Sequence, residues 1–247
     1  MRFLRFIYRS VRAVLAFAEA GIESARYART HPDADDVSYH YSSRLARGFE
    51  RTLGLRYVIR NSERLLDSQP CVYFANHRSN LDVVTLIAAF PPRTVVIGKI
   101  EVTRVPWFGT IFVKGKNIAI DRKDHSDSMA GMAKAERAIT DQRLSVFVFP
   151  EGTRNFGKMR KFKKGGFHLA RNTGRPIVPL VCAVPKGWVS PRRMRKQTDV
   201  LIDVLEPIDP NSFASLEELM DHTRAVMGSA LEALETEIEV QGLSQNE

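Results

Sequence analysis

Short runs of β-branched and aromatic residues alternate along the chain with longer segments of helical periodicity. The short runs predict strands, and the segments around them predict helices. This alternation indicates an α/β fold, a single-domain sandwich whose mixed, largely parallel sheet of about seven strands is flanked by helices. The predicted strands are residues 56–60, 71–75, 94–98, 117–121, 145–149, 177–184 and 199–205, and the predicted helices are residues 37–54, 80–90, 127–142, 164–174 and 215–240.

The first 30 residues carry a different pattern and precede a polar, proline-containing break at residues 30–36. On a helical wheel, four arginines fall within an arc of about 80°, and mostly apolar side chains fill the remainder. This pattern is typical of a basic amphipathic helix that lies in the bilayer interface. The alternative is a helix that covers the protein's own core with its arginines outward. The arginines are Arg2, Arg5, Arg9 and Arg12, and Glu19, Glu23 and Arg26 extend their stripe.

We therefore expect two parts, residues 1–30 as a membrane-interface helix and residues 38–247 as the α/β domain. No window of 18 apolar residues occurs, which argues against a membrane span. Arg12 would interrupt the apolar region of a signal peptide, which argues against that reading too. Cys71 and Cys182 lie in apolar runs, and buried thiols of this kind suit a reducing compartment.

The charge distribution points to an anionic partner. The formal net charge is +9, and no Asp or Glu occurs between Gly152 and Thr198. Residues 155–198 hold twelve Lys and Arg, whereas residues 211–247 hold eight acids and one arginine. Such a concentrated basic region needs nucleic acid, a membrane surface or an anionic small substrate as its partner, although a solvated surface is the alternative.

A histidine and an aspartate follow the predicted strand 71–75. Sites in α/β folds lie beyond the carboxyl ends of strands. His77 is placed on the turn after the strand and Asp82 in the first turn of the next helix, with Ser79 or Asn80 available as the helix cap. An imidazole oriented by a carboxylate can act as a general base. Two solvated residues on a turn are the alternative.

Other predicted strands end in the same way. Strand 145–149 runs into Pro150, Glu151, Gly152, Thr153 and Arg154, where a surface ion pair is the alternative to a binding loop. An arginine fork suits phosphate oxygens, and glycine lets a backbone N–H approach a ligand closely. Strand ends therefore supply one base and three cations, which predicts one anion-binding catalytic crevice. The cations are Lys99, Arg122 and Arg154.

These residues, in order, resemble the motifs of the glycerolipid acyltransferases, and most closely those of the lysophosphatidic acid acyltransferase group. Asn76 to Asp82 matches the family's His-x4-Asp motif, and residues 149–154 match its third motif. The second motif is similar to Lys99, Pro106, Gly109 and Arg122, and the fourth to Pro179. The resemblance covers roughly residues 70–185, with "FKKGGFHLA" between the third and fourth motifs.

The resemblance implies transfer of an acyl group from a thioester to the sn-2 hydroxyl of 1-acyl-sn-glycerol-3-phosphate, giving phosphatidic acid. His77 would remove the hydroxyl proton and Asp82 would orient His77. Backbone N–H groups of the turn or helix start after His77 would stabilise the oxyanion. Lys99, Arg122 and Arg154 would bind phosphate, while Glu151, Gly152 and Thr153 would shape the acceptor pocket. Asn76, Pro106, Gly109, Pro150 and Pro179 would support the motifs.

The same resemblance implies neither a metal nor a resident cofactor, because acyl-CoA or an acyl carrier protein thioester is the co-substrate. The expected partners are that donor and an anionic bilayer, on the cytoplasmic face of a bacterial-type inner membrane. Another lyso-lipid, such as a lyso-ornithine lipid or a lysophospholipid, is the alternative acceptor. The classes argued against are a zinc enzyme, a serine hydrolase, a P-loop protein and a nucleic-acid binder, because their signatures are missing from the sequence. A non-catalytic peripheral membrane protein is a further alternative.

Overall fold

A seven-stranded sheet forms the centre of the computed structural model, which describes residues 2–78, 81–106, 108–121, 123–154, 159–188 and 197–244. The strand order is β1-β7-β6-β2-β5-β3-β4, and every pair is parallel except β6 with β7. The sequence prediction of a mixed, largely parallel sheet is confirmed. The strands are β1 (Leu55–Arg60), β2 (Val72–Ala75), β3 (Thr94–Lys99), β4 (Ile118–Ile120), β5 (Ser145–Val148), β6 (Ile177–Ala183) and β7 (Thr198–Val204).

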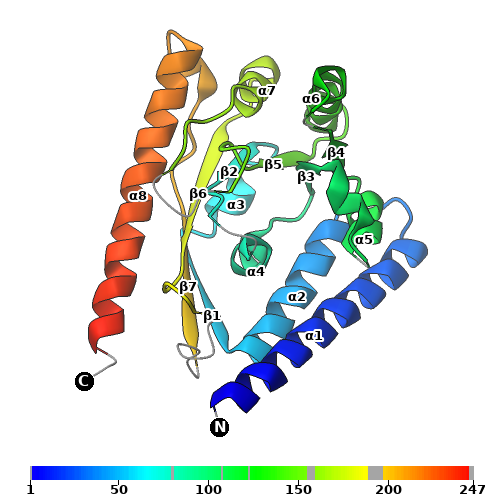
Figure 1. Cartoon of the computed structure of the whole chain (residues 1–247). Helices are drawn as coiled ribbons and strands as arrows, with labels where there is room; N and C mark the ends of the chain where they lie inside the picture. The colour runs from blue at the N-terminus through cyan, green and yellow to red at the C-terminus, as the bar shows by residue number, and fades with distance from the viewer. Residues whose placement is uncertain are drawn as a thin grey trace.

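Helices cover both faces of the sheet (Figure 1). Successive side chains of a strand point to opposite faces, so Val72 and Phe74 of β2 pack with one helical layer and Tyr73 and Ala75 with the other. The first layer contains α6 (His125–Thr140), α7 (Gly165–Thr173) and α8 (Leu216–Ser244), and the second contains α1 (Arg2–Thr30), α2 (Val37–Leu53), α4 (Asp82–Thr85) and α5 (Phe108–Lys114). The remaining elements are α3 (Arg64–Asp67) and the 3₁₀ helices η1 (Ile87–Ala89), η2 (Ile100–Arg104) and η3 (Pro210–Ser212).

The predicted helix 80–90 is the clearest departure from the sequence expectation. It forms only the short α4 and then the 3₁₀ turn η1, and Phe90 is already extended. Pro91 accounts for that end, because a residue before proline is pushed away from the helical region. Helix α6 departs in the other direction and begins at His125, because the Asp124 side chain accepts hydrogen bonds from two amides of its first turn.

Helix α1 packs along α2 through small side chains. Ala16, Ala20 and Ser24 are buried, and a Cβ added at Gly48 of α2 would lie 2.8 Å from the Cβ of Ala16. Phe17 makes an edge-to-face contact with Tyr41 at 6.0 Å between ring centroids. The two helices therefore approach each other at backbone distance, and α1 is held by packing as well as by the chain.

The opposite side of α1 presents exposed apolar side chains. The sequence alternative, in which α1 covers the core with its arginines outward, is wrong for Arg9, whose guanidinium donates to the Leu53 carbonyl at 3.3 Å. The side chains of Arg2 and Arg5 lie outside the described part of the chain. Within that part, no helix is long and apolar enough to cross a bilayer. The exposed apolar residues are Phe3, Leu4, Ile7, Tyr8, Val11, Val14, Leu15 and Ile22, which we call the α1 stripe. The division into residues 1–30 and 38–247 remains a prediction.

Strands β2 to β6 run in one direction, so their carboxyl ends open at the same edge of the sheet. Strand β2 lies at the centre of the order, between β6 and β5. Its carboxyl end therefore lies at the middle of this edge and leads directly to His77.

The close contact of α1 with α2 predicts opposite effects for one substitution at two helical glycines. Gly48→Ala places a methyl group against Ala16 and should lower the free energy of unfolding by about 1 kcal/mol or more, despite a better helix propensity. Gly228→Ala in α8 meets nothing within 4 Å and should raise it by about 0.5–1 kcal/mol. Denaturant unfolding measures both. Equal effects would contradict the packing.

Candidate active site

His77 and Asp82 meet at the carboxyl end of β2. Their Nδ1 and Oδ2 atoms are 2.5 Å apart, and the same Oδ2 accepts the Arg78 amide at 2.8 Å. The carboxylate only accepts, so Nδ1 of a neutral imidazole carries the proton and Nε2 keeps its lone pair. The His77 ring also stacks on Phe149 at 4.2 Å, which fixes its plane. The turn between strand and helix thus joins two residues that one continuous helix would separate.

Asn76 ties this turn to the neighbouring strand β6. Its side-chain amide donates to the Cys182 carbonyl at 3.0 Å and accepts the Cys182 amide at 2.8 Å. Both groups are buried, so the pair replaces backbone hydrogen bonds that would otherwise be lost where β2 ends. Burial raises the pKa of the Cys182 thiol to about 12, so the thiol is protonated at neutral pH and is a poor nucleophile.

Glu151 is a buried carboxylate that joins two backbone segments. Its Oε1 accepts the His77 amide at 2.9 Å, and its Oε2 accepts the Arg160 amide at 3.0 Å. The side chain is almost inaccessible, with 2% of its residue surface exposed. A buried carboxylate is tolerated only when hydrogen bonds satisfy it. Glu151 therefore fixes the position of the His77 backbone relative to the loop at Arg160.

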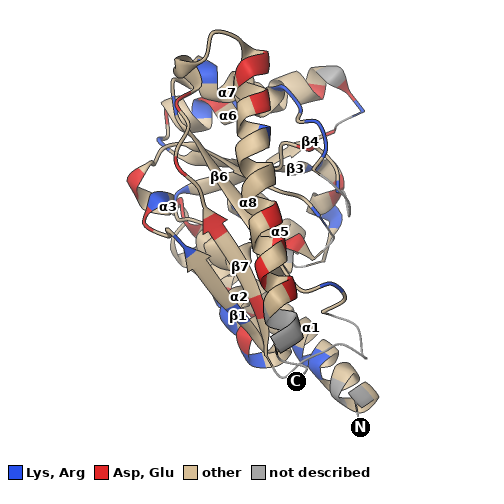
Figure 2. Ribbon diagram, turned by 90° about the vertical axis from the view of Figure 1, so that its left-hand side faces the viewer, with Lys and Arg blue, Asp and Glu red and all other residues tan. Residues whose placement is uncertain are grey.

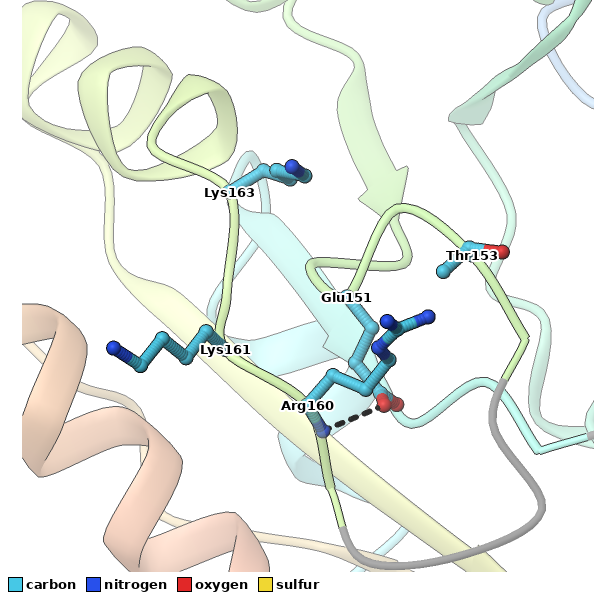
Figure 3. Close-up of a pocket in the computed structure, with 5 residues that line it drawn as sticks. All are labelled: Glu151, Thr153, Arg160, Lys161 and Lys163. Carbon is cyan, nitrogen blue, oxygen red and sulfur yellow. Dashed lines mark hydrogen bonds between the residues drawn. The ribbon is translucent and has the colours of Figure 1, made fainter.

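A pocket of about 390 Å³ opens beside Glu151 (Figure 3). Its residues come from the turn after β5 and from the segment before α7, and most of them are basic. Glu151 and Thr153, which the family resemblance predicts to shape an acceptor pocket, both line this pocket. The walls are formed by Glu151, Thr153, Arg160, Lys161 and Lys163.

The motif-supporting residues lie at backbone constrictions. A Cβ at Gly109 would be 2.0 Å from the Thr103 carbonyl oxygen, so only glycine fits there. Pro106 accepts the Phe108 amide at 2.6 Å in the same turn. Pro150 accepts the Lys163 amide at 2.7 Å. Pro179 sits in the middle of β6, opposite Phe74 of β2.

The predicted cations are not gathered as tightly as His77 and Asp82. Lys99 is exposed at the end of β3, and Arg154 is exposed just after the β5 turn. Both lie at the carboxyl edge of the sheet, but among the described residues neither forms a hydrogen bond or an ion pair with His77. Arg122 lies outside the described residues.

Several contacts of the site were missed from the sequence. Phe149 belongs to the third motif and Lys163 to the segment "FKKGGFHLA", but the sequence does not predict that the Phe149 ring stacks on His77 or that Lys163 lines a pocket, and it shows Arg160 only as part of a basic stretch. Arg78 forms an ion pair with Glu235 of α8 at 2.8 Å. Acidic residues occur along α8 (Figure 2). The pair of Arg78 with Glu235 therefore joins the acidic C-terminal helix to the turn of His77. Among the described residues, no three His, Cys, Asp or Glu side chains are grouped to hold a metal ion.

The double role of Glu151 predicts a loss of stability on a nearly isosteric change. Glu151→Gln replaces one acceptor oxygen with an amide nitrogen that cannot accept an N–H, so one buried amide loses its partner. The free energy of unfolding should fall by about 1–3 kcal/mol. Glu63→Gln, which removes the same charge at an exposed position, should stay within about 0.5 kcal/mol of the wild type. An unchanged Glu151→Gln protein in denaturant titrations would refute the bridge.

Comparison with known proteins places this geometry in a family. Residues 56–183 match the family described as Acyltransferase. The 1-acyl-sn-glycerol-3-phosphate acyltransferase of Haemophilus influenzae is 31% identical over 200 residues, which cover 78% of this chain and 83% of that protein. The Escherichia coli enzyme of the same description is 30% identical over 202 residues, covering 81% of this chain and 80% of that protein.

The fold is also shared with a solved structure. The crystal structure of the 1-acyl-sn-glycerophosphate (LPA) acyltransferase from Thermotoga maritima superimposes with a TM-score of 0.72 at 24% identity, and covers 95% of this chain and 98% of that chain. The resemblance drawn from the motifs is thereby confirmed. The chain belongs to the acyltransferase family, together with the 1-acyl-sn-glycerol-3-phosphate acyltransferases, and is an O-acyltransferase.

Proposed function

We propose that the protein transfers an acyl group from a thioester to the sn-2 hydroxyl of 1-acyl-sn-glycerol-3-phosphate, forming phosphatidic acid. The observation that carries the mechanism is the His77–Asp82 pair with its Nδ1···Oδ2 distance of 2.5 Å. The choice of acceptor rests on the relatives from Haemophilus influenzae and Escherichia coli, which bear that activity in their names.

His77 acts as general base and then as general acid. Its Nε2 takes the proton of the acceptor hydroxyl while the hydroxyl oxygen attacks the thioester carbonyl carbon. The tetrahedral intermediate collapses with cleavage of the carbon–sulfur bond, and the departing thiolate receives the proton from the imidazolium. Asp82 keeps the ring oriented and stabilises its charged form. A thioester needs neither a metal nor a covalent enzyme intermediate for this exchange.

The oxyanion donors of the intermediate are not the first two amides of the turn. The His77 amide donates to Glu151 and the Arg78 amide donates to Asp82. Both amides are therefore already used in holding the base. The amides of Ser79 and Asn80 follow next in the chain and are the proposed oxyanion donors. Both residues lie outside the described residues.

The reaction uses two substrates, an acyl donor and an acceptor that carries a phosphate. Acyl-CoA or an acyl carrier protein thioester supplies the acyl group. Lys99 and Arg154, together with Arg122, act as cations for the acceptor phosphate, because a guanidinium or ammonium group forms strong hydrogen bonds to phosphate oxygens. Glu151, Gly152 and Thr153 shape the acceptor side of the site.

The α1 stripe anchors the enzyme at the surface of an anionic bilayer, on the cytoplasmic face. Its apolar side chains are between 43% and 70% exposed, on the side of α1 turned away from α2. Both the acceptor and the product are amphiphiles that reside in the bilayer. An enzyme held at the interface therefore meets them without extracting them far from the lipid.

Removal of the base tests the mechanism. His77→Ala should lower kcat for acyl transfer by about 10²–10⁴-fold or more without loss of folding. The control is His168→Ala, which removes an exposed histidine of α7 and should leave kcat unchanged. Thiol release from the donor, measured with 1-acyl-sn-glycerol-3-phosphate as acceptor, reports the rate. A His77→Ala enzyme that retains its kcat would exclude the proposed base.

Charge placed on the α1 stripe tests the membrane anchor. The triple variant Leu4→Glu, Val11→Glu, Leu15→Glu should reduce binding to anionic vesicles by about 100-fold or more, because each apolar side chain contributes about 1.5 kcal/mol or more on burial. This design is cleaner than deleting α1, which would uncover the surface of α2. The control triple adds the same charge at Leu66, Met129 and Val240, which are as exposed but lie on other elements. Equal vesicle binding by both triples would remove the anchor role from α1.

A further inference from the structure

Three cations line the pocket, and none of them forms an ion pair with a carboxylate among the described residues. Other lysines of the acid-free stretch are neutralised by α8, since Lys164 pairs with Glu217 at 2.7 Å and Lys186 with Glu239 at 3.2 Å. Within the described ranges, Arg160 and Lys163 have no carboxylate oxygen within 4.0 Å. Like charges gathered in a hollow repel each other, and this arrangement favours an anionic ligand between them.

The ammonium group of Lys163 is brought to the pocket by the third motif. Its amide donates to the Pro150 carbonyl at 2.7 Å, which fixes the backbone. Its aliphatic stem lies against Gly152, where an added Cβ would be 3.1 Å from the Lys163 Cγ. Gly152 also has a φ of +69°, a conformation that favours glycine. The glycine therefore leaves room for the lysine stem as well as allowing the turn.

The guanidinium of Arg160 points into the same hollow. Its backbone is held by Glu151, while Figure 3 shows its side chain directed between Glu151 and Thr153. Lys163 lies above it in this view, and Lys161 turns its ammonium group away toward α8. Glu151, the pocket's one acid among the described residues that line it, spends both oxygens on backbone amides. The positive charge of the hollow is thus left for a ligand.

The pocket and the base are linked through Glu151, which lines the pocket and accepts the His77 amide. Two hydrogen bonds to one carboxylate keep the amide nitrogens of His77 and Arg160 within about 8 Å of each other. In a glycerol 3-phosphate, four bonds join the sn-2 oxygen to phosphorus, which limits their separation to about 5 Å. A lipid whose hydroxyl reaches Nε2 of His77 would therefore place its phosphate within reach of the long Arg160 and Lys163 side chains.

We infer that Arg160 and Lys163, with the Thr153 hydroxyl, bind the phosphate of the acceptor and select a monoester dianion over a phosphodiester. This inference rests on the proposed function and adds residues outside the predicted phosphate-binding set. A phosphate monoester carries close to two charges at neutral pH, whereas a phosphodiester carries one. Added cations favour the more highly charged monoester, and its three terminal oxygens can accept from both side chains and the hydroxyl.

The donor's phosphates fit this pocket less well. They are separated from the thioester by the long uncharged pantetheine arm, so they lie far from the reacting carbonyl and from His77. A cationic hollow that shares Glu151 with the His77 backbone is too near the base for them. The geometry points to the acceptor.

The experiment compares two acceptors that differ in phosphate charge. The probes are 1-acyl-sn-glycerol-3-phosphate and 1-acyl-sn-glycero-3-phosphoglycerol with one thioester donor. Arg160→Gln and Lys163→Gln should each raise the KM of the monoester about tenfold or more, because each removes a charge-assisted hydrogen bond. The preference for monoester over diester in kcat/KM should fall by the same factor, while the donor KM stays within about twofold. Lys163→Arg should retain most of the preference.

Lys164→Gln is the matched control, since it removes the same charge one residue away from Lys163, at a side chain that does not line the pocket and pairs with Glu217. Unchanged acceptor KM in both Arg160→Gln and Lys163→Gln would overturn the inference, as would a rise in donor KM alone. An equal loss in Lys164→Gln would reduce the effect to general electrostatics and would also overturn it.

A binding measurement covers variants that turn over too slowly. In the His77→Ala background, calorimetric titration with the monoester should show weaker binding when Lys163→Gln is added. Equal affinity of the two proteins for the monoester would overturn the assignment of Lys163 to the phosphate site. Failure of the proposed function looks different from either result. In that case the wild-type enzyme would acylate neither acceptor.

Discussion

The buried carboxylate of Glu151 is the constraint on which the site depends. It belongs to the turn after β5, yet its two oxygens hold the amides of His77 and Arg160. Strands β2 and β5 are parallel neighbours, so their carboxyl ends already lie side by side. One side chain can then fix three loops at once, because each hydrogen bond is formed in a buried place where water cannot replace it. The geometry of the candidate site is set by backbone contacts as much as by the side chains of His77 and Asp82.

The distribution of charge around the site depends on helix α8. The acidic helix α8 takes up Lys164, Lys186, Arg60 and Arg78, on segments around the site. These pairs are largely exposed, and each contributes little to stability. Their effect is electrostatic, because they neutralise basic residues around the site and leave the remaining positive charge at the pocket. The acidic tail and the basic stretch, which look unrelated in the sequence, thereby define one local field.

The sequence predicted the parts of this structure that depend on local chemistry. All seven strands were found because β-branched runs and glycine or proline boundaries mark them. His77 lies on the predicted turn and Asp82 at the predicted helix start, because β2 ends at Ala75 and α4 begins at Asp82. The bridge from Glu151 to His77 spans 74 positions and requires knowing that β2 lies beside β5. Helix 80–90 was overestimated because its apolar periodicity gave no sign of the change to a 3₁₀ turn.

The sequence could not predict which surface of α1 contacts α2, for a related reason. A helical wheel shows an apolar surface and a polar one, but not which surface meets α2. The structure answers with small residues, since Ala16, Ala20 and Ser24 face the domain while the larger apolar side chains face outward. Arg9, expected at the water side, instead satisfies a carbonyl at the end of α2. Side-chain size, more than polarity, decided the contact surface.

The backbone approach of Ala16 to Gly48 makes α1 a rigid strut instead of a flexible tether. A tethered enzyme would tumble above the lipid, and its crevice would face the bilayer only part of the time. In the proposed membrane-bound state, such a rigid helix would fix the tilt of the whole domain relative to the bilayer, and with it the height of His77 above the headgroups. Lateral diffusion within the leaflet would then bring acceptors to an enzyme held at a constant tilt and carry products away, with no desorption step in the cycle.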